Sequence, residues 1–490
     1  MPRPAAARRS GGPGTARSAP ARPNPQVGRF RGPGPRPARP PRSPDAPPGG
    51  GSGRRRAAAR FPSGPLPRPH DPPRQDGNRM RKILIVGAGQ SGLQLAIGLL
   101  GDGYDVTLVT LQSPDELRAG RVLSTQCLFG TALRRERRHR LAFWDGDAPE
   151  ITGVGMVIAD GQGAQEASWT GRLREPAQSV DQRVKLAAWL EEFERRGGRT
   201  VYHGATLSDL EWFGGAYDLT VVAAGKGELS ALFEPDRARS RPAGPRRTLA
   251  LAYVHGMAEH PEGPVMHRSA VPGAGEVITL PALTVSGRCH AVLVEAVPGG
   301  PMDRPVPSRP QPGMVLEGIL DVLRDSAPWV YERCTEVRPT DPAAEARGGY
   351  APAVRNPVGR LPGGAAVLGM ADAVVVNDPI TSQGANAASA CAEVYRRAIV
   401  DHGGRPFDEE FMRGAFSAYW RHARHVTAWS EVMLDGPPHA WELLRAAADH
   451  PGLADRFAAA FDDPSDLIGW FLHPERAYEY LDLVRSGAPA

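Results

Sequence analysis

The chain has 490 residues, of which 41% are hydrophobic and 23% are charged, and its formal net charge is +5. This length and apolar content suffice for two or three domains with a sizeable core. Residues 1–79 hold 17 of the 59 basic and 3 of the 54 acidic residues, so the rest of the chain carries a net charge of −9. Nucleic-acid binding by the folded part therefore has no support from charge.

Residues 1–79 also contain 20 Pro and 12 Gly and almost no aliphatic side chains. Such a segment cannot offset its ordering entropy, and we expect a disordered extension. Met80 directly precedes the first predicted strand, which favours an upstream extension that is not translated or not used. A basic arm that binds anionic surfaces is the alternative.

The four cysteines lie far apart, without C-x-x-C spacing. They indicate reduced thiols in a cytoplasmic protein, with neither a disulfide framework nor a metal site. The apolar window at residues 83–100 is interrupted by polar residues and glycines, and there is no signal-peptide pattern. We therefore expect no membrane association.

Residues 82–100, KILIVGAGQSGLQLAIGLL, predict a buried strand, a glycine turn and an amphipathic helix. Gly87, Gly89 and Gly92 have G-x-G-x-x-G spacing, which permits the turn, the approach of a pyrophosphate and the packing of helix on strand. Free N–H groups and the helix dipole would face the phosphates. This context indicates a dinucleotide site.

A second strand is predicted at residues 105–111, followed by a loop at residues 118–128. The strand lacks the terminal acid that usually holds ribose hydroxyls, because Asp115 and Glu116 come late. An ordinary NAD site is thereby disfavoured.

Residues 151–170 alternate like an antiparallel sheet, and a helix is predicted at residues 179–196. A strand at residues 217–224 runs into Ala224 and Gly225, which suits either a bound nucleotide or a structural turn. Several short strands at residues 249–297 indicate an inserted antiparallel domain.

The final third of the chain returns to the nucleotide-binding pattern before it becomes helical. A strand at residues 366–369 leads to Asp372, and a loop through Asp378 and Pro379 leads to a helix starting near Gly384. Helices follow from residue 407, with four tryptophans that we expect in the core.

Three separated motifs agree: GAGQSG, YDLTVVAAG, and GMAD with DPITSQGAN. Together they resemble FAD-dependent monooxygenases with the glutathione-reductase type of nucleotide fold. The spacing from Met80 onward most resembles the oxygenase component of two-component styrene and indole monooxygenases. The resemblance implies an α/β fold: an FAD-binding Rossmann-like domain with an inserted antiparallel β-sheet substrate domain and C-terminal helices.

The expected organisation alternates between these parts. It comprises the extension at 1–79, FAD-binding segments at 80–150, 179–245 and 351–405, substrate-domain segments at 151–178 and 246–350, and a C-terminal helical region at 406–490.

The resemblance also implies site residues, and it implies no metal. The implied FAD contacts are Gly87, Ala88, Gly89, Ser91, Gly92, Arg121, Ala224, Gly225, Asp372, Pro379, Gly384, Ala385 and Asn386. The implied catalytic residues are Arg121, Ser124, Pro379 and Gln383. A turn aspartate at Asp372 and a solvated loop charge at Arg121 are the structural alternatives. A helix N-terminus near Gly384 would stabilise negative charge on a reduced flavin ring.

Six residues match the substrate pocket of the family: Ser124, Gln126, Leu128, Ile151, Val154 and Ala177. This set resembles the indole-preferring branch, although Leu128 stands where a methionine is expected. A Ser and a Gln can hydrogen-bond a heteroaromatic N–H, which styrene lacks, while aliphatic residues hold the ring flat.

The chemistry implied by the resemblance belongs to the cofactor. Reduced FAD and molecular oxygen form a C4a-hydroperoxide, which epoxidises the 2,3-bond of indole and, less readily, styrene. Because the chain has a single G-x-G-x-x-G motif, we expect a separate NAD(P)H-dependent flavin reductase to supply reduced FAD, with NADH used only by that reductase. The expected partners are this reductase and a small aromatic substrate, and a homodimer is left open.

Two alternatives remain. One is a single-component FAD aromatic hydroxylase that uses NAD(P)H directly, and the other is a flavin-binding redox sensor without catalysis. A flavin halogenase is disfavoured because the chain has no W-x-W-x-I-P segment.

Overall fold

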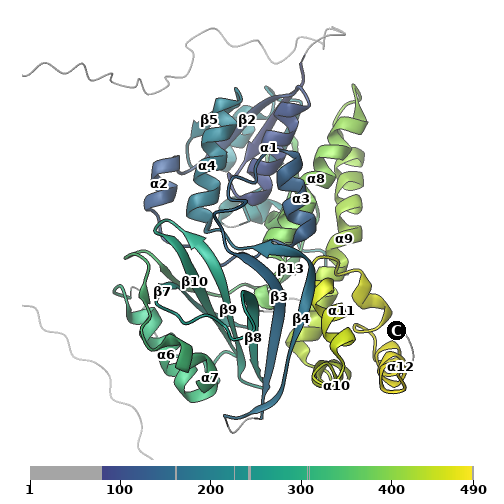
Figure 1. Ribbon diagram of the computed structural model, residues 1–490. Coiled ribbons are helices and arrows are strands. Elements are labelled where there is room, and N and C mark those ends of the chain that lie inside the picture. The colour runs from purple at the N-terminus through teal and green to yellow at the C-terminus, as the bar shows by residue number, and fades with distance from the viewer. Residues whose placement is uncertain are drawn as a thin grey trace, which may run out of the picture. The chain divides into compact units, whose positions relative to one another are not determined.

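The computed structural model describes residues 80–160, 163–225, 227–240, 244–305, 307 and 310–487. The predicted extension at residues 1–79 lies outside the described residues. The described part contains two large sheets, one nearer each end of the view in Figure 1.

Six described strands form the first sheet, in the order β14-β15-β6-β1-β2-β5. Only β14 runs antiparallel to its neighbour. Parallel strands are covered on both faces and read as continuous apolar runs, as Ile83 to Val86 do with at most 3% of each side chain exposed. The strands are β1 (Lys82–Val86), β2 (Asp105–Thr110), β5 (Arg199–Tyr202), β6 (Leu219–Val222), β14 (Val358–Arg360) and β15 (Ala366–Gly369).

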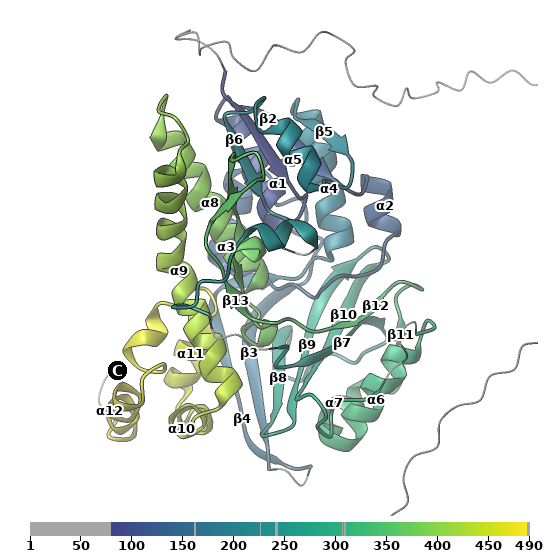
Figure 2. The same ribbon diagram turned by 180° about the vertical axis from the view of Figure 1, so that it is seen from behind.

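Helices cover this sheet on both sides. Figure 1 shows α1 and α4 in front of the strands, and Figure 2, seen from behind, shows α5. Helix α1 is buried along almost its whole length, because it packs against β2, α4 and α8. The helices are α1 (Gln90–Gly101), α2 (Pro114–Ala119), α3 (Gly130–Arg138), α4 (Gln182–Arg195), α5 (Leu207–Phe213), α8 (Gly384–His402) and α9 (Glu409–Asp435).

The carboxyl ends of three strands meet at one edge of the first sheet. Val222 pairs with both Val86 and Gly369 in the parallel register. Beyond the strands, the N–H of Ala223 donates to Val86 O at 2.8 Å and that of Met370 donates to Val222 O at 2.9 Å. The glycine-containing parts of the three motifs therefore lie side by side, although about 280 residues separate Gly87 from Gly369.

Eight described strands form the second sheet, in the order β11-β7-β10-β9-β8-β3-β4, with β12 also paired to β7. All pairs are antiparallel except β3 with β8. Its strands are β3 (Glu150–Ala159), β4 (Gln165–Gln178), β7 (Thr248–His255), β8 (Val265–Val271), β9 (Gly275–Thr284), β10 (Gly287–Ala296), β11 (Arg338–Pro339) and β12 (Glu345–Gly348). The strands β7 to β10 are longer than the short strands predicted from sequence.

The two faces of the second sheet belong to different cores. On β10, Val292 and Val294 pack with α6 (Met314–Ser326), whereas Ala291 and Leu293 belong to a core shared with the C-terminal helices. This alternation is the ordinary period of a strand with both faces covered. The C-terminal helices are α10 (Pro438–Ala446), α11 (Pro451–Ala460) and α12 (Pro474–Arg485), and α7 (Pro328–Tyr331) follows α6.

The remaining short elements connect these layers. They are β13 (Ala353–Val354), paired with β16 (Val375–Val376), and the 3-10 turns η1 (Glu228–Leu232), η2 (Glu332–Cys334), η3 (Ala371–Ala373), η4 (Pro379–Thr381) and η5 (Asp466–Gly469).

Among the element boundaries that differ from those predicted, two have a clear local cause. The helix predicted at residues 179–196 begins at Gln182, because Asp181 accepts the N–H of Arg183 as an N-cap. Arg118, predicted in a loop, lies in α2, whose capping box joins Ser113 and Glu116. Glu116 is thus used to cap a helix, which explains why it follows β2 too late to serve a ribose.

Candidate functional site

The glycine turn after β1 forms an open cradle at the start of α1. Gly87 has φ of +115°, a conformation that favours glycine. A Cβ on Gly92 would lie 2.0 Å from Gly87 O, so this glycine allows the helix to pack on the turn. A Cβ on Gly89 would meet nothing within 4 Å, and α1 has no side-chain cap. Space and unsatisfied N–H groups therefore coincide, as a pyrophosphate site needs.

Ala88 and Ser91 lie within the same turn, and Ser91 is buried. Next to it, the buried Gln90 amide donates to Glu136 Oε1 at 3.2 Å, and Lys185 Nζ donates to the same oxygen at 2.8 Å. Neither Glu136 nor Lys185 is more than 2% exposed. This network fixes the first turn of α1, and the sequence analysis did not find it because its members are far apart in the chain.

The turn after β6 packs directly on the GMAD motif. A Cβ on Gly225 would lie 2.4 Å from Asp372 Cβ, so the glycine lets the two turns meet. Ala224 is half-buried beside it, and Asp372 is exposed on η3. The exposed carboxylate lies at the edge where the strands end, which fits the predicted contact with the ribityl or phosphate region of FAD.

The DPITSQGAN motif forms a turn that leads into α8. Asp378 Oδ1 accepts the N–H of Ile380 at 3.1 Å, and Ser382 adopts a left-handed conformation with φ of +54°. Helix α8 begins at Gly384 without a side-chain cap, and a Cβ there would meet nothing within 4 Å. The N-terminus of α8 is therefore a second helix start that is open and has no side-chain cap, and it follows Pro379 in the chain. The positive end of its helix dipole fits the anionic ring of a reduced flavin.

Two side chains of this motif make long-range contacts. Gln383 is 2% exposed and donates from Nε2 to Phe461 O at 2.9 Å, so its amide ties α8 to the C-terminal region. Asn386 contacts the loop before α3. The neighbouring Ala385 packs against Leu128. A catalytic role for Gln383 stays a prediction.

Arg121 is exposed on the loop between α2 and α3. The following residue, Val122, is buried and donates its N–H to Ala343 O at 3.0 Å. The loop is thus anchored directly beside Arg121, and the contact of its guanidinium with FAD stays a prediction.

The structure brings the predicted aliphatic pocket residues together. Ile151 and Ala177 are cross-strand partners on β3 and β4, and Val154 lies on the same face of the sheet. All three are fully buried. They share one core with Tyr253 on β7. Leu128 instead points to a small cluster with Ala385, although its backbone pairs with Gln178.

Ser124 and Gln126 are held by the N-terminal region of α4. Gln182 Nε2 donates to Ser124 Oγ at 2.9 Å, and Gln126 Nε2 donates to Val180 O at 2.9 Å. Gln126 is buried, and its Oε1 has no hydrogen-bond partner among the described residues. Because the Val180 carbonyl needs the amide nitrogen, the orientation of the Gln126 side chain is settled, and a buried acceptor remains.

A buried ion cluster stands behind these two residues. Arg183 makes a bidentate pair with Asp341 at 2.9 Å for each contact, and its Nε donates to Asp181 at 2.9 Å. Thr284 donates to Asp181 at 2.6 Å. The hydrogen bonds with Asp341 and Asp181 raise the pKa of Arg183 despite the opposing effect of burial. The cluster joins α4 to the end of β9, and sequence spacing gave no signal for it.

Three further charged residues, on β8, β9 and β10, face the core that contains Ile151, Val154 and Ala177. Arg268, Glu276 and Glu295 are all at most 4% exposed. Each occupies a position where strand alternation predicts an apolar side chain, so the charge at these positions is a signal that the sequence contains. Burial raises the pKa of Glu276, opposed by Arg268, and raises that of Asp378 to about 6.

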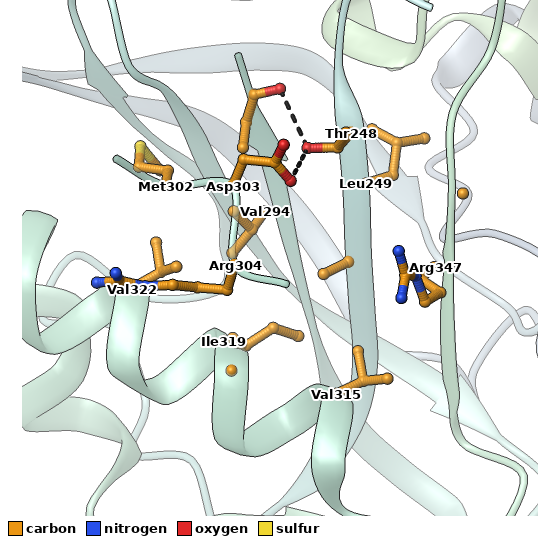
Figure 3. Close-up of a pocket in the computed structure, with 14 residues that line it drawn as sticks. Thr248, Leu249, Val294, Met302, Asp303, Arg304, Val315, Ile319, Val322 and Arg347 are labelled. Carbon is orange, nitrogen blue, oxygen red and sulfur yellow. Dashed lines mark hydrogen bonds between the residues drawn. The ribbon is translucent and has the colours of Figure 1, made fainter. Parts of the chain in front are cut away.

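A small cavity lies on the opposite face of the second sheet. It measures about 60 Å³ and is bordered by β7, β10 and α6, as Figure 3 shows. Thr248 Oγ1 donates to Asp303 Oδ1 at 2.8 Å at its rim, while Val315 and Ile319 of α6 form its floor. None of the predicted site residues lines it.

Among the described residues, no helix is long and apolar enough to cross a membrane. No group of three or more His, Cys, Asp or Glu side chains within the described ranges is arranged to hold a metal ion.

The sequence matches proteins of one enzyme type. Residues 225–333 match the family described as "Styrene monooxygenase A putative substrate binding domain". The chain is 29% identical over 406 residues to styrene monooxygenase StyA of Pseudomonas fluorescens, covering 81% of this chain and 96% of that protein. Styrene monooxygenase StyA of Pseudomonas sp matches with the same identity and coverage.

Solved flavoproteins share the fold at low sequence identity. The flavin-dependent brominase Bmp2 superposes with a TM-score of 0.59 at 14% identity, covering 83% of this chain and all of that one. A flavoprotein/dehydrogenase from Cytophaga hutchinsonii gives 0.60 at 12% identity, covering 83% and 99%. The predicted α/β fold class with an FAD-binding Rossmann-type domain is confirmed. Together with the sequence matches, which cover most of the chain, this indicates a flavin-dependent monooxygenase similar to styrene monooxygenase StyA.

Proposed function

We propose that this monooxygenase epoxidises the C=C bond of indole, or of a related vinyl arene such as styrene, with reduced FAD and molecular oxygen. The observation that carries the preference for indole is the unpartnered Oε1 of Gln126. A buried acceptor without a donor is costly, and an indole N–H would satisfy it. Styrene has no N–H and would leave that acceptor unpaired.

The surroundings of Gln126 support this orientation. Val180 holds the amide nitrogen, so the acceptor oxygen cannot be exchanged for the donor without losing that bond. Ser124 is fixed by Gln182, while its carbonyl accepts from Tyr253 Oη at 3.4 Å. The polar atoms are thus preorganised before a substrate arrives.

The aliphatic side chains provide the apolar part of the proposed pocket. Ile151, Val154 and Ala177 lie on one rigid sheet face, where their positions are set by strand pairing. A flat bicyclic ring gains from such a surface through area burial and dispersion. A larger side chain at position 177 would reduce the flat apolar surface that is left for the ring.

The cofactor site proposed here comprises the two open helix N-termini. Gly87, Gly89 and Gly92 would hold the pyrophosphate, Asp372 the ribityl or phosphate region, and the turn from Pro379 to Asn386 the ring. Bound reduced FAD, with molecular oxygen, supplies the electrophilic oxygen atom. The residues of this chain bind and orient the two ligands, and the packed sheet face excludes water.

The source of the reduced cofactor is also part of the proposal. A separate NAD(P)H-dependent flavin reductase would supply reduced FAD, since one G-x-G-x-x-G motif occurs in the chain. The spaced, buried cysteines favour a cytoplasmic location.

The test is indigo formation from indole by the full chain with FAD and NADH, with and without a generic flavin reductase. Indigo only with the reductase supports the proposal. Indigo without it would replace the proposal by a single-component aromatic hydroxylase. Tight FAD binding with no product from indole or styrene would favour a flavin-binding redox sensor.

A further inference from the structure

The sheet face that carries Val154 also carries a cluster of charged side chains near the DPITSQGAN turn. Glu276 on β9 and Glu295 on β10 are direct cross-strand partners. Cross-strand partners place their Cβ atoms about 4.5–5.5 Å apart on one face. Ala270 pairs with Glu276, so Arg268, two residues along β8, lies on that face as well.

Arg268 connects this cluster to the turn at Pro379–Thr381. Its Nε lies 2.6 Å from Glu276 Oε1, and both side chains are at most 5% exposed. Its guanidinium also donates to the carbonyl oxygen of Ile380 and, at 3.5 Å, to Ser382 Oγ. Arg268, which contacts the turn, is thus already paired with Glu276.

Glu295 and Asp378 remain without such a partner. Glu295 is fully buried, and neither of its oxygens has a hydrogen-bond donor among the described residues. Asp378 is 2% exposed, and its Oδ2 likewise has none in the described part of the chain. Two ionised carboxylates in this setting would be strongly disfavoured, because burial penalises the charge and their repulsion adds to the penalty.

The other charged groups around the pair do not remove this penalty. Arg247 and Arg246 precede β7 and act on Asp378 through their charge. Arg246 pairs with Asp435 at 2.7 Å, and Arg247 donates to the carbonyl of Arg246 at 2.9 Å. Burial, followed by the charge of Asp378, raises the pKa of Glu295 well above its usual value.

We propose that Glu295 and Asp378 form a coupled acid pair that retains a proton at neutral pH, and that this proton keeps the turn at Pro379–Thr381 seated on the second sheet. The pair would then carry one negative charge, as do other coupled carboxyl groups that cannot both ionise. Glu295 is a positioning residue in this arrangement. The inference rests on the proposed function only where it concerns flavin, because the proton is a property of the protein alone.

The pair makes stability depend on pH in a defined direction. An acid whose pKa is higher in the folded than in the unfolded state binds its proton more tightly when folded. Its contribution to the free energy of unfolding is therefore complete below the unfolded pKa and is lost as pH rises through the folded value. We therefore predict that stability falls as pH rises above the ordinary carboxyl range, through the pKa of about 6 of Asp378 and onward through the higher pKa of Glu295.

The first test uses the full-length protein without added flavin. Infrared difference spectra between the wild type and Glu295→Gln at pH 7 should contain the carbonyl stretch of a protonated carboxyl group, and thermal unfolding should lose its alkaline fall in Glu295→Gln. Glu345→Gln is the matched control, because this buried carboxylate accepts the N–H groups of Gly313 and Leu316. That variant should keep the alkaline fall. Absence of the carboxyl band, or an unchanged pH profile in Glu295→Gln, would overturn the inference.

The second test measures the binding of anaerobically reduced FAD to the wild type and to Glu295→Gln across pH. In the wild type, the dissociation constant should rise with pH by up to about tenfold per unit, the limit for one linked proton. In Glu295→Gln it should stay flat at the value that the wild type has at low pH. A flat profile in the wild type would overturn the link to flavin. Failure of the proposed function would show separately, as absence of product from indole and styrene with the infrared band still present.

Discussion

Asn386 Nδ2 donates to the carbonyl oxygen of Cys127 at 2.9 Å, and its Oδ1 accepts the N–H of Phe129 at 3.1 Å. One side chain in the first turn of α8 thereby holds the backbone on both sides of Leu128. The residue expected to contact the flavin also fixes the loop that carries the expected substrate contacts.

Asn386→Ala should lower the free energy of unfolding by about 1–3 kcal/mol, because buried donors and acceptors lose their partners. It should also weaken flavin binding, since the loop and α8 separate. Ser389→Ala on the same helix is the control, because the buried Ser389 Oγ has no hydrogen-bond partner among the described residues. Chemical unfolding and flavin titration of both variants check this, and equal effects of the two substitutions would contradict it.

Gly92→Ala and Gly89→Ala should separate folding from cofactor binding. The new Cβ at position 92 would lie 2.0 Å from Gly87 O, so we expect a loss of about 1–3 kcal/mol in stability. The Cβ at position 89 would meet nothing within 4 Å, so stability should change little while FAD binding weakens. Unfolding curves and FAD titrations measure both effects. Unimpaired FAD binding by Gly89→Ala would argue against the pyrophosphate position.

Arg183→Met should destabilise the protein by about 3–5 kcal/mol, because it leaves the carboxylates of Asp181 and Asp341 without their buried cation. The control is Arg118→Met, which removes a bidentate pair with Glu191 on the surface, at 2.7 and 2.6 Å. Exposed pairs contribute about 0–1 kcal/mol, so this variant should unfold almost like the wild type. Similar losses of unfolding free energy in both variants would show that burial does not increase the contribution of the Arg183 cluster.

Gln126→Leu should reduce indole oxidation relative to styrene oxidation. The variant removes the acceptor proposed for the indole N–H, and a lost buried hydrogen bond of about 1–3 kcal/mol corresponds to a change of roughly fivefold to 150-fold in relative kcat/KM. Measuring both substrates on the same protein cancels losses from folding or flavin binding. A ratio that stays at the wild-type value would exclude Gln126 as the selective contact.

The nucleotide-binding half of the chain could be predicted from the local spacing of its apolar residues and glycines. The strand, turn and helix at residues 82–100 could be predicted because a short continuous apolar run and a longer apolar segment are separated by closely spaced glycines. The start of α8 near Gly384 was predicted correctly for the same reason. The start of α4 was predicted three residues early, because Ser179 and Val180 are held by the distant Leu283.

The polar contacts of the candidate site could not be predicted from local patterns, because they join residues that are far apart in the sequence. Gln126 was selected by resemblance, but only the Val180 carbonyl decides which of its two amide atoms is left for a ligand. Glu295 lies in the otherwise apolar run at residues 291–296 of β10, and the protonation that we propose for it depends on Asp378, more than 80 residues away. The clamp of Arg183 on Asp341 spans the inserted sheet in the same way.

The amino-acid sequence by itself determined most of the strands, the start of α8 and the glycine turns, because periodicity and backbone freedom act within a few neighbouring residues. The tertiary structure alone decided which polar atoms have partners, since a buried hydrogen bond or charge pair depends on groups that the fold brings together from distant parts of the chain. The free oxygen of Gln126 and the unpartnered carboxyl groups of Glu295 and Asp378 follow from that pairing.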